Sequence, residues 1–225
     1  ITALYHLVNI IDKTIETERQ YAGMATKVAL FSGVDDSCAR SRWFYNDMKR
    51  IGDKVLNPLN ITYTLCDGRL STSNFYRMKT IMESDNQHLF VYSGHGSYSG
   101  IGNPFSAGGD VLSINTTAPF PMGFGFACSL GSYGYDGNAF AMQWVRSEYG
   151  GVTFYGASVT TMDCPDRYLS RHVFDTYRKI RESYANYPIS IWLRNAEQSY
   201  YRSSPGPIRG HQVMKYNLIG DPTLH

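Results

Sequence analysis

This chain of 225 residues has few cysteines, a small net charge and no long apolar run, and each of these features excludes a class of protein. The four cysteines (Cys38, Cys66, Cys128 and Cys164) are too few and too scattered for a disulfide scaffold, and no CxxC pair indicates structural zinc. With 21 basic against 19 acidic residues and no run of Lys or Arg, the chain lacks the concentrated positive charge that nucleic acid requires. Its longest apolar runs reach about six residues, whereas a membrane-spanning helix needs about 20. We therefore expect neither a nucleic-acid-binding protein nor a membrane span.

Short apolar runs that alternate with segments of helical period are the main pattern that is present. Hydrophobic residues make up 43% of the chain and charged residues 18%, which indicates a folded domain with a sizeable core. Six runs predict strands, at residues 27–32, 61–66, 88–93, 122–127, 151–157 and 212–219. Helical periodicity marks residues 40–56, 72–83, 138–149, 166–187 and 189–201. The sequence thus predicts one α/β domain whose mostly parallel sheet is covered on both faces.

The start of the chain has the pattern of a further helix. Apolar residues recur there at helical spacing, at Leu4, Leu7, Val8, Ile11 and Ile15. The chain begins at Ile1 without Met or a signal peptide. We therefore expect it to start inside a larger precursor, with any targeting segment removed or located upstream.

Residues with useful chemistry follow the predicted strands. In a parallel sheet, ligands bind beyond the carboxyl ends of the strands. The segments at those ends are 33–36 (GVDD), 67–68 (DG), 94–97 (GHGS), 128–131 (CSLG) and 158–166 (SVTTMDCPD). A histidine, a cysteine and several acids are therefore expected at one edge of the sheet.

His95 lies between Gly94 and Gly96, whose backbone freedom allows the imidazole to project into a cleft. Imidazole exchanges protons near neutral pH, which suits general acid–base catalysis. The alternative is a turn histidine that only hydrogen-bonds a loop. A phosphate-binding loop does not fit, because the third glycine and the following lysine of such loops are missing.

Cys128 follows the apolar run 122–127, at the point where the strand meets a turn. On its own it is equally consistent with a small buried residue. Neighbouring parallel strands lie about 4.8 Å apart, so side chains at adjacent strand ends reach each other. The sequence therefore predicts a dyad in which His95 activates the Cys128 thiol.

These motifs resemble the gingipain family of cysteine peptidases, in the caspase-like clan. The likeness rests on residues 94–97 and 127–131, in that order, and covers nearly the whole chain. Residues 11–19 (IDKTIETER) resemble the helix that leads into the second catalytic subdomain of that family, and residues 216–224 (YNLIGDPTL) resemble the segment that closes it. The resemblance implies a caspase-like three-layer sandwich with a mostly parallel six-stranded sheet, as a single catalytic subdomain over residues 1–225. It also implies that a smaller first subdomain and a following immunoglobulin-like domain lie outside this chain.

The resemblance assigns roles to several residues. Cys128 matches the nucleophile, His95 the catalytic histidine, and Asp35 the acid that orients the histidine, although Asp36 fits equally well. For both acids the alternative is an Asp-rich turn that caps the next helix. We expect the backbone N–H groups of Gly96 and Cys128 to form the oxyanion hole.

Specificity is expected to depend on residues 158–166, which line the primary substrate pocket in relatives. Asp163 and Asp166 are the candidate substrate-binding acids there, because a carboxylate at the floor of a narrow pocket pairs with Lys or Arg. The alternative is that Asp166 caps the following helix and Asp163 is solvated. Two features depart from the family pattern: the stretch lacks its usual Trp, and the Asp of Arg-cleaving members is replaced near Arg42, with Asp47 close by.

The sequence therefore predicts a cysteine endopeptidase that cleaves protein or peptide substrates, with Lys or Arg before the scissile bond as the expected specificity. Two alternatives remain: a sortase-like transpeptidase of the same family, and a non-catalytic caspase-like binding module. The chemistry needs no cofactor and no catalytic metal, while relatives make structural calcium possible. The resemblance further implies a secreted or cell-surface bacterial protein, whose partner is the N-terminal subdomain or propeptide of its own precursor.

Overall fold

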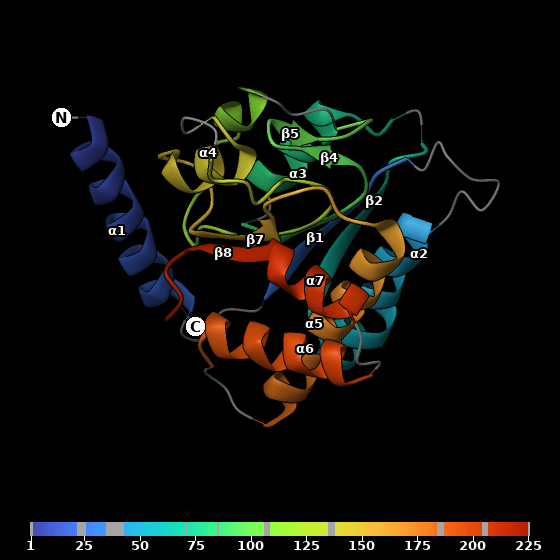
Figure 1. The fold of residues 1–225 in the computed structure, drawn as a ribbon. Helices are drawn as coiled ribbons and strands as arrows, with labels where there is room; N and C mark the ends of the chain where they lie inside the picture. The colour runs from blue at the N-terminus through green and yellow to red at the C-terminus, as the bar shows by residue number, and fades with distance from the viewer. Residues whose placement is uncertain are drawn as a thin grey trace.

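A six-stranded sheet forms the centre of the molecule (Figure 1). The computed structural model describes residues 2–21, 26–34, 43–70, 72–84, 86–105, 109–134, 138–183, 187–203 and 207–224. The strands are β1 (Lys27–Ser32), β2 (Thr62–Asp67), β3 (Leu89–Ser93), β6 (Met122–Phe126), β7 (Thr153–Ala157) and β8 (Tyr216–Gly220), in the order β2-β1-β3-β6-β7-β8. All neighbours pair in parallel except β8, which is antiparallel to β7. The predicted mostly parallel six-stranded sheet is confirmed.

Seven helices accompany the sheet in the described part of the chain. They are α1 (Thr2–Tyr21), α2 (Trp43–Ile51), α3 (Phe75–Ser84), α4 (Phe140–Arg146), α5 (Asp163–Ser183), α6 (Ile189–Ser203) and α7 (Pro207–Lys215). A π-helical turn (Gly52–Leu56) extends α2, and short 3₁₀ turns cover Asn57–Leu59 and Gly109–Ser113. A small hairpin joins β4 (Gly96–Ser97) to β5 (Gly100–Ile101). None of the described helices has the length and apolar character needed to cross a membrane.

One predicted element is wrong in part: residues 212–215 belong to α7, and the last strand begins only at Tyr216. Pro207 starts this helix, a position where proline is favoured because its missing N–H has no helical partner. The side chain of Gln212 is buried while that of Met214 is 81% exposed. The short apolar run at this point fitted either a helix or a strand, and tertiary packing decided between them.

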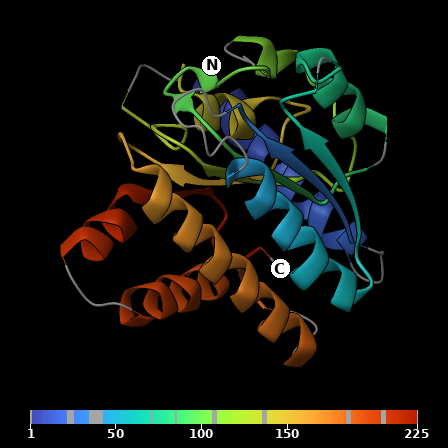
Figure 2. The same ribbon diagram turned by 90° about the vertical axis from the view of Figure 1, so that its right-hand side faces the viewer.

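Alternation of side chains along the strands divides the core into two layers. Val28 and Leu30 of β1 pack against α2, α5 and α6, in a cluster that includes Met48, Val173 and Trp192. Ala29 and Phe31 face the opposite side, with α3 and α4, in a cluster that includes Met78, Phe140 and Trp144. Figure 1 shows α3 and α4 on one side of the sheet and α5 and α6 on the other, and Figure 2 shows α2 beside α5. The predicted three-layer sandwich is confirmed.

Helix α1 packs on the α4 side of the core through Ile10 and through a buried polar contact. The buried ammonium of Lys13 donates hydrogen bonds to the carbonyls of Val145 (2.9 Å), Ser147 (2.5 Å) and Gly151 (2.9 Å). Two of these carbonyls belong to the C-terminal end of α4, where a cation is favourable. The apolar residues that predicted the helix are instead 44–67% exposed, namely Leu4, Leu7, Val8, Ile11 and Ile15.

We expect Lys13 to make stability depend on pH. Burial lowers the pKa of Lys13 from 10.5 to about 7, so between these values the unfolded state binds more protons than the folded state. The free energy of unfolding therefore rises with pH over this range. Compared with Lys13→Met, the unmodified protein is expected to gain up to about 1.4 kcal/mol per pH unit between about pH 7.5 and 9.5. Urea unfolding at both pH values measures this gain, and a difference independent of pH would contradict it.

Candidate active site

The ends of β3 and β6 bring His95 next to Cys128. Ser93 pairs with Phe126 in the sheet, so His95 and Cys128 each lie two residues beyond a matched pair. The backbone of Gly96 is also close to the cysteine, because a Cβ added to Gly96 would lie 2.9 Å from the carbonyl oxygen of Cys128. Only glycine fits here without displacing the chain that carries the thiol. The sheet thus places an imidazole and a thiol at the same edge.

Hydrogen bonds to its backbone fix His95 while its side chain stays exposed. The His95 carbonyl accepts hydrogen bonds from the Tyr92 hydroxyl (2.7 Å) and the Gly102 N–H (2.8 Å). Burial raises the pKa of Tyr92, so its hydroxyl remains a donor. The imidazole makes an edge contact with the ring of Phe44, at 5.6 Å between centroids. Although both residues are described, no hydrogen bond joins the His95 ring to the Cys128 thiol in this structure.

A tight turn after β6 presents the thiol of Cys128, which is half-buried. Ser129 has a φ of +57°, a left-handed conformation that is uncommon for residues other than glycine. Its N–H donates to the carbonyl of Val159 (3.1 Å), and the N–H of Gly131 donates to that of Ala157 (2.8 Å). Among the described residues, the N–H of Cys128 has no acceptor. This N–H is therefore available to an oxygen that arrives from outside.

The polar contacts of the Cys128 sulfur come from the loop after β7. The distances from Sγ are 3.4 Å to the N–H nitrogen of Thr161, 3.6 Å to its Oγ1 and 3.7 Å to its carbonyl oxygen. The Thr161 hydroxyl in turn donates to Oδ2 of Asp166 (2.5 Å). Oδ1 of Asp166 accepts hydrogen bonds from the Tyr216 hydroxyl (2.7 Å) and from the side-chain amide of Gln212. Burial, and after it the carboxylate of Asp166, raises the pKa of Tyr216.

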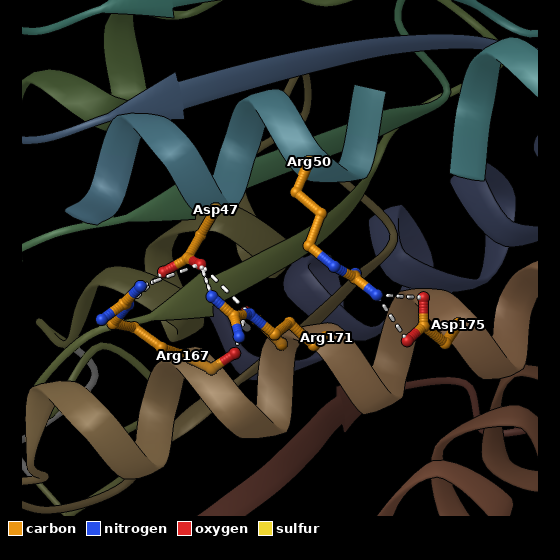
Figure 3. A network of polar contacts seen from close by, with 6 residues as sticks. Asp47, Arg50, Arg167, Arg171 and Asp175 are labelled. Carbon is orange, nitrogen blue, oxygen red and sulfur yellow. Dashed lines mark hydrogen bonds and ion pairs between the residues drawn. The ribbon is translucent and has the colours of Figure 1, made fainter. Parts of the chain in front are cut away.

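Ion pairs between α2 and α5 support this edge of the sheet (Figure 3). Asp47 of α2 is 1% exposed and accepts hydrogen bonds from Arg167 (2.5 Å) and Arg171 (2.9 Å) of α5. The guanidinium of Arg167 also lies over the ring of Trp43, 4.4 Å from its centroid. Helix α2 carries Phe44, which contacts His95, and α5 follows the loop that contacts Cys128. The ion pairs therefore join the helix that contacts His95 to the helix that follows the loop in contact with Cys128.

The residues that the sequence singled out have different places in the structure. Asp35 and Asp36 lie outside the described residues. Asp163 is the first residue of α5, and its side chain is likewise outside the description. Asp166 is 4% exposed and directs both oxygens at donors of the protein itself, so its position does not support direct contact with substrate.

Sequence reasoning missed two contacts of the site. Thr161 appeared only as one member of the stretch 158–166, and Phe44 was not singled out. Neither contact has a spacing signal, because Thr161 is 33 residues from Cys128 and α2 is farther still from His95 in the chain. The one available hint was the position of the loop beyond a strand end, where functional groups gather.

Within the described residues, no group of three or more His, Cys, Asp or Glu side chains is arranged to hold a metal ion. Structural calcium was expected only from the resemblance to relatives, and it stays a prediction.

The fold and the family of this chain agree. A three-layer sandwich with a mostly parallel sheet, and with a histidine and a cysteine at neighbouring strand ends, defines a caspase-like α/β protein. The sequence matches peptidase family C25 over residues 1–225. The chain therefore belongs to this family, the gingipain family, as the sequence motifs predicted. No curated protein sequence matches it.

Solved structures show the same fold at low sequence identity. The Arg-specific cysteine proteinase gingipain R (RgpB) superposes with a TM-score of 0.80 at 15% identity, over 97% of this chain and 52% of that one. The complex of the pro- and mature domains of RgpB from Porphyromonas gingivalis gives 0.76 at 17% identity, over 96% and 52%. Separase from Saccharomyces cerevisiae, in complex with securin, gives 0.57 at 12% identity, over 88% and 12%. The chain thus spans about half the length of the gingipain structures.

Proposed function

We propose that this chain forms the catalytic part of a cysteine endopeptidase, with Cys128 as the nucleophile and His95 as the general acid and base. The main support is the register of β3 and β6, which brings a half-buried thiol and an exposed imidazole to one edge of the sheet. Membership in a peptidase family adds to this support. A binding module has no chemical need for both groups.

The reaction follows from these groups. The sulfur of Cys128 attacks the scissile carbonyl and its proton passes to His95, which gives a tetrahedral oxyanion. Collapse of this intermediate breaks the C–N bond and leaves a thioester, and His95 protonates the departing amine. Water, deprotonated by His95, then hydrolyses the thioester and restores the thiol. Hydride or electron transfer is not involved, so the proposed chemistry uses no cofactor.

Backbone N–H groups are proposed to stabilise the oxyanion. The N–H of Cys128 has no acceptor among the described residues, and the backbone of Gly96 lies against Cys128. A well-aligned donor of this kind contributes about 3 kcal/mol to the transition state. Asp35 is proposed to orient His95. In the sequence Asp35 follows β1, and β1 pairs with β3, the strand that precedes His95.

Cleavage after Lys or Arg is the specificity that we propose. It rests on the acid Asp163 at the start of α5 and on the likeness to gingipain R, which is described as Arg-specific. Cleavage of a peptide library, followed by mass spectrometry of the products, tests it. A profile without preference for basic residues before the cut would exclude this specificity and leave the peptidase proposal intact.

We also propose that the chain is one catalytic subdomain of a longer, secreted or surface-exposed bacterial protein. It spans about half of the gingipain chains, one of which was solved as a complex of pro- and mature domains. The exposed apolar residues of α1 are the proposed contact for a preceding subdomain or propeptide. Size-exclusion chromatography of the chain with and without its preceding segment, expressed separately, tests this contact.

Labelling with peptidyl acyloxymethyl ketones that end in Arg, in Lys or in a neutral residue tests the central proposal. At least one of these reagents is expected to form one thioether adduct, located at Cys128 by peptide mapping, and to leave the exposed Cys164 unmodified. Absence of label at Cys128 with every reagent in folded protein would favour the binding module. Incubation of the protein with an intact peptide substrate and a primary amine separates hydrolysis from transpeptidation. Only a transpeptidase is expected to yield the amide product in quantity.

A further inference from the structure

Thr161 surrounds the Cys128 sulfur with three polar atoms. Its N–H, hydroxyl oxygen and carbonyl oxygen lie 3.4–3.7 Å from Sγ, and within the described residues the sulfur has no other hydrogen-bond partner. Thr161 is itself 9% exposed, so water does not compete freely for these atoms. The immediate polar environment of the thiol is thus set by one residue.

The direction of the Thr161 hydroxyl is set by Asp166. A carboxylate only accepts hydrogen bonds, so the single hydroxyl proton of Thr161 is directed to Oδ2 of Asp166, 2.5 Å away. Oδ1 of Asp166 is held in place by the buried Tyr216 and Gln212. The hydroxyl oxygen therefore turns its lone pairs, and not its proton, toward the Cys128 sulfur.

We infer that Thr161 and Asp166 are positioning residues for the nucleophile: Asp166 orients the Thr161 hydroxyl so that its oxygen accepts the S–H proton of Cys128. This inference rests on the proposed role of Cys128. The N–H of Thr161 remains the donor available to the sulfur after the proton has left for His95. The thiol thus has two acceptors on Thr161, the hydroxyl oxygen at 3.6 Å and the carbonyl oxygen at 3.7 Å, and the thiolate has the N–H of the same residue as its donor.

The substitution Asp166→Asn is expected to reverse the direction in which the Thr161 hydroxyl donates its hydrogen bond. Two donors, the Tyr216 hydroxyl and the Gln212 amide, meet at Oδ1, so the amide oxygen of Asp166→Asn is favoured there and its NH₂ group faces Thr161. The Thr161 oxygen then accepts from this NH₂ group, and its proton turns toward the sulfur. A hydrogen bond donated to the sulfur favours the thiolate, which is the form that reacts with electrophiles.

Alkylation by iodoacetamide at pH 7 measures this change without any peptide substrate. We expect Asp166→Asn to raise the alkylation rate of Cys128 about fivefold, which corresponds to one neutral hydrogen bond of about 1 kcal/mol. The exposed thiol of Cys164, resolved by peptide mapping, is the internal reference and keeps its rate. Circular dichroism and thermal unfolding establish that each variant is folded.

A double-mutant cycle separates orientation from a general loosening of the site. In a Thr161→Val background, which lacks the hydroxyl, Asp166→Asn is expected to leave the rate unchanged. In a Thr161→Ser background, which keeps it, the increase is expected to return. If Asp166→Asn does not fold, the single variants decide: Thr161→Val raises the rate because one of the two S–H acceptors is lost while the carbonyl of residue 161 remains, and Thr161→Ser does not.

Equal effects of Asp166→Asn with and without the hydroxyl would overturn the inference, as would a slower reaction of Cys128 in a folded variant. The outcome is independent of peptidase activity. A coupled cycle in a protein that cleaves no peptide would retain the inference and reject the proposed function. Cleavage of peptide substrates by Cys128, together with a double-mutant cycle that shows no coupling, would retain the proposed function and reject the inference.

Discussion

Replacement of Cys128 by alanine is expected to abolish peptide-bond cleavage and to leave the fold intact. Alanine removes the only atom that forms the thioester, so the rate should fall by about a thousandfold or more. The lost contacts are a few weak hydrogen bonds of sulfur to Thr161 at 3.4–3.7 Å. The free energy of unfolding is therefore expected to change by less than about 1 kcal/mol.

The measurement is kcat/KM on the best substrate from a peptide library, together with urea unfolding of the same preparations. Cys164→Ala is the matched control, because its thiol is exposed and is the second residue of α5. The control is expected to keep full activity. Cleavage by Cys128→Ala at the rate of the unmodified protein would refute the proposed mechanism, and loss of activity in both variants would implicate the loop at the start of α5 rather than the nucleophile.

The sheet could be predicted because its strands are buried on both faces. The apolar run at residues 88–93 required no alternation to be recognised, and β3 lies within one residue of it. The last strand was predicted four residues too long at its start, because the side chains of 212–215 fit a helix as well as a strand. In that segment the side chain of Gln212 is buried and donates a hydrogen bond to Asp166, 46 residues away in the chain. Such a contact has no trace in local periodicity.

Local sequence motifs predicted one part of the candidate site, and the other part depends on contacts between distant residues. His95 and Cys128 could be located because each follows a strand in a short motif, and the register of β3 and β6 is a property of the sheet. The roles of Thr161 and Asp166 depend on where a loop turns its side chains. An acid after a strand is consistent with a substrate pocket or with an internal hydrogen bond, and only burial distinguishes the two.

Asp47 and Asp175 offer a comparison between a buried and an exposed ion pair on the same two helices (Figure 3). The carboxylate of Asp47 is 1% exposed and faces two guanidinium groups, those of Arg167 and Arg171. Both oxygens of Asp175 accept from one terminal nitrogen of Arg50, and the Asp175 side chain is 43% exposed. Water replaces a lost partner at the exposed pair and not at the buried one.

We expect Asp47→Asn to lower the free energy of unfolding by about 3–5 kcal/mol, and Asp175→Asn by less than about 1 kcal/mol. The large loss follows because the guanidinium groups of Arg167 (16% exposed) and Arg171 (33% exposed) keep their charges while the buried position between them loses its counterion. Urea unfolding of both variants at low and high salt measures it. Salt is expected to weaken the Asp175 pair and to have little effect on the Asp47 pair, since screening acts mainly on exposed charges. Equal losses in the two variants would show that burial of Asp47 does not control the contact between α2 and α5, and the ion pairs would then not be the support of the candidate site.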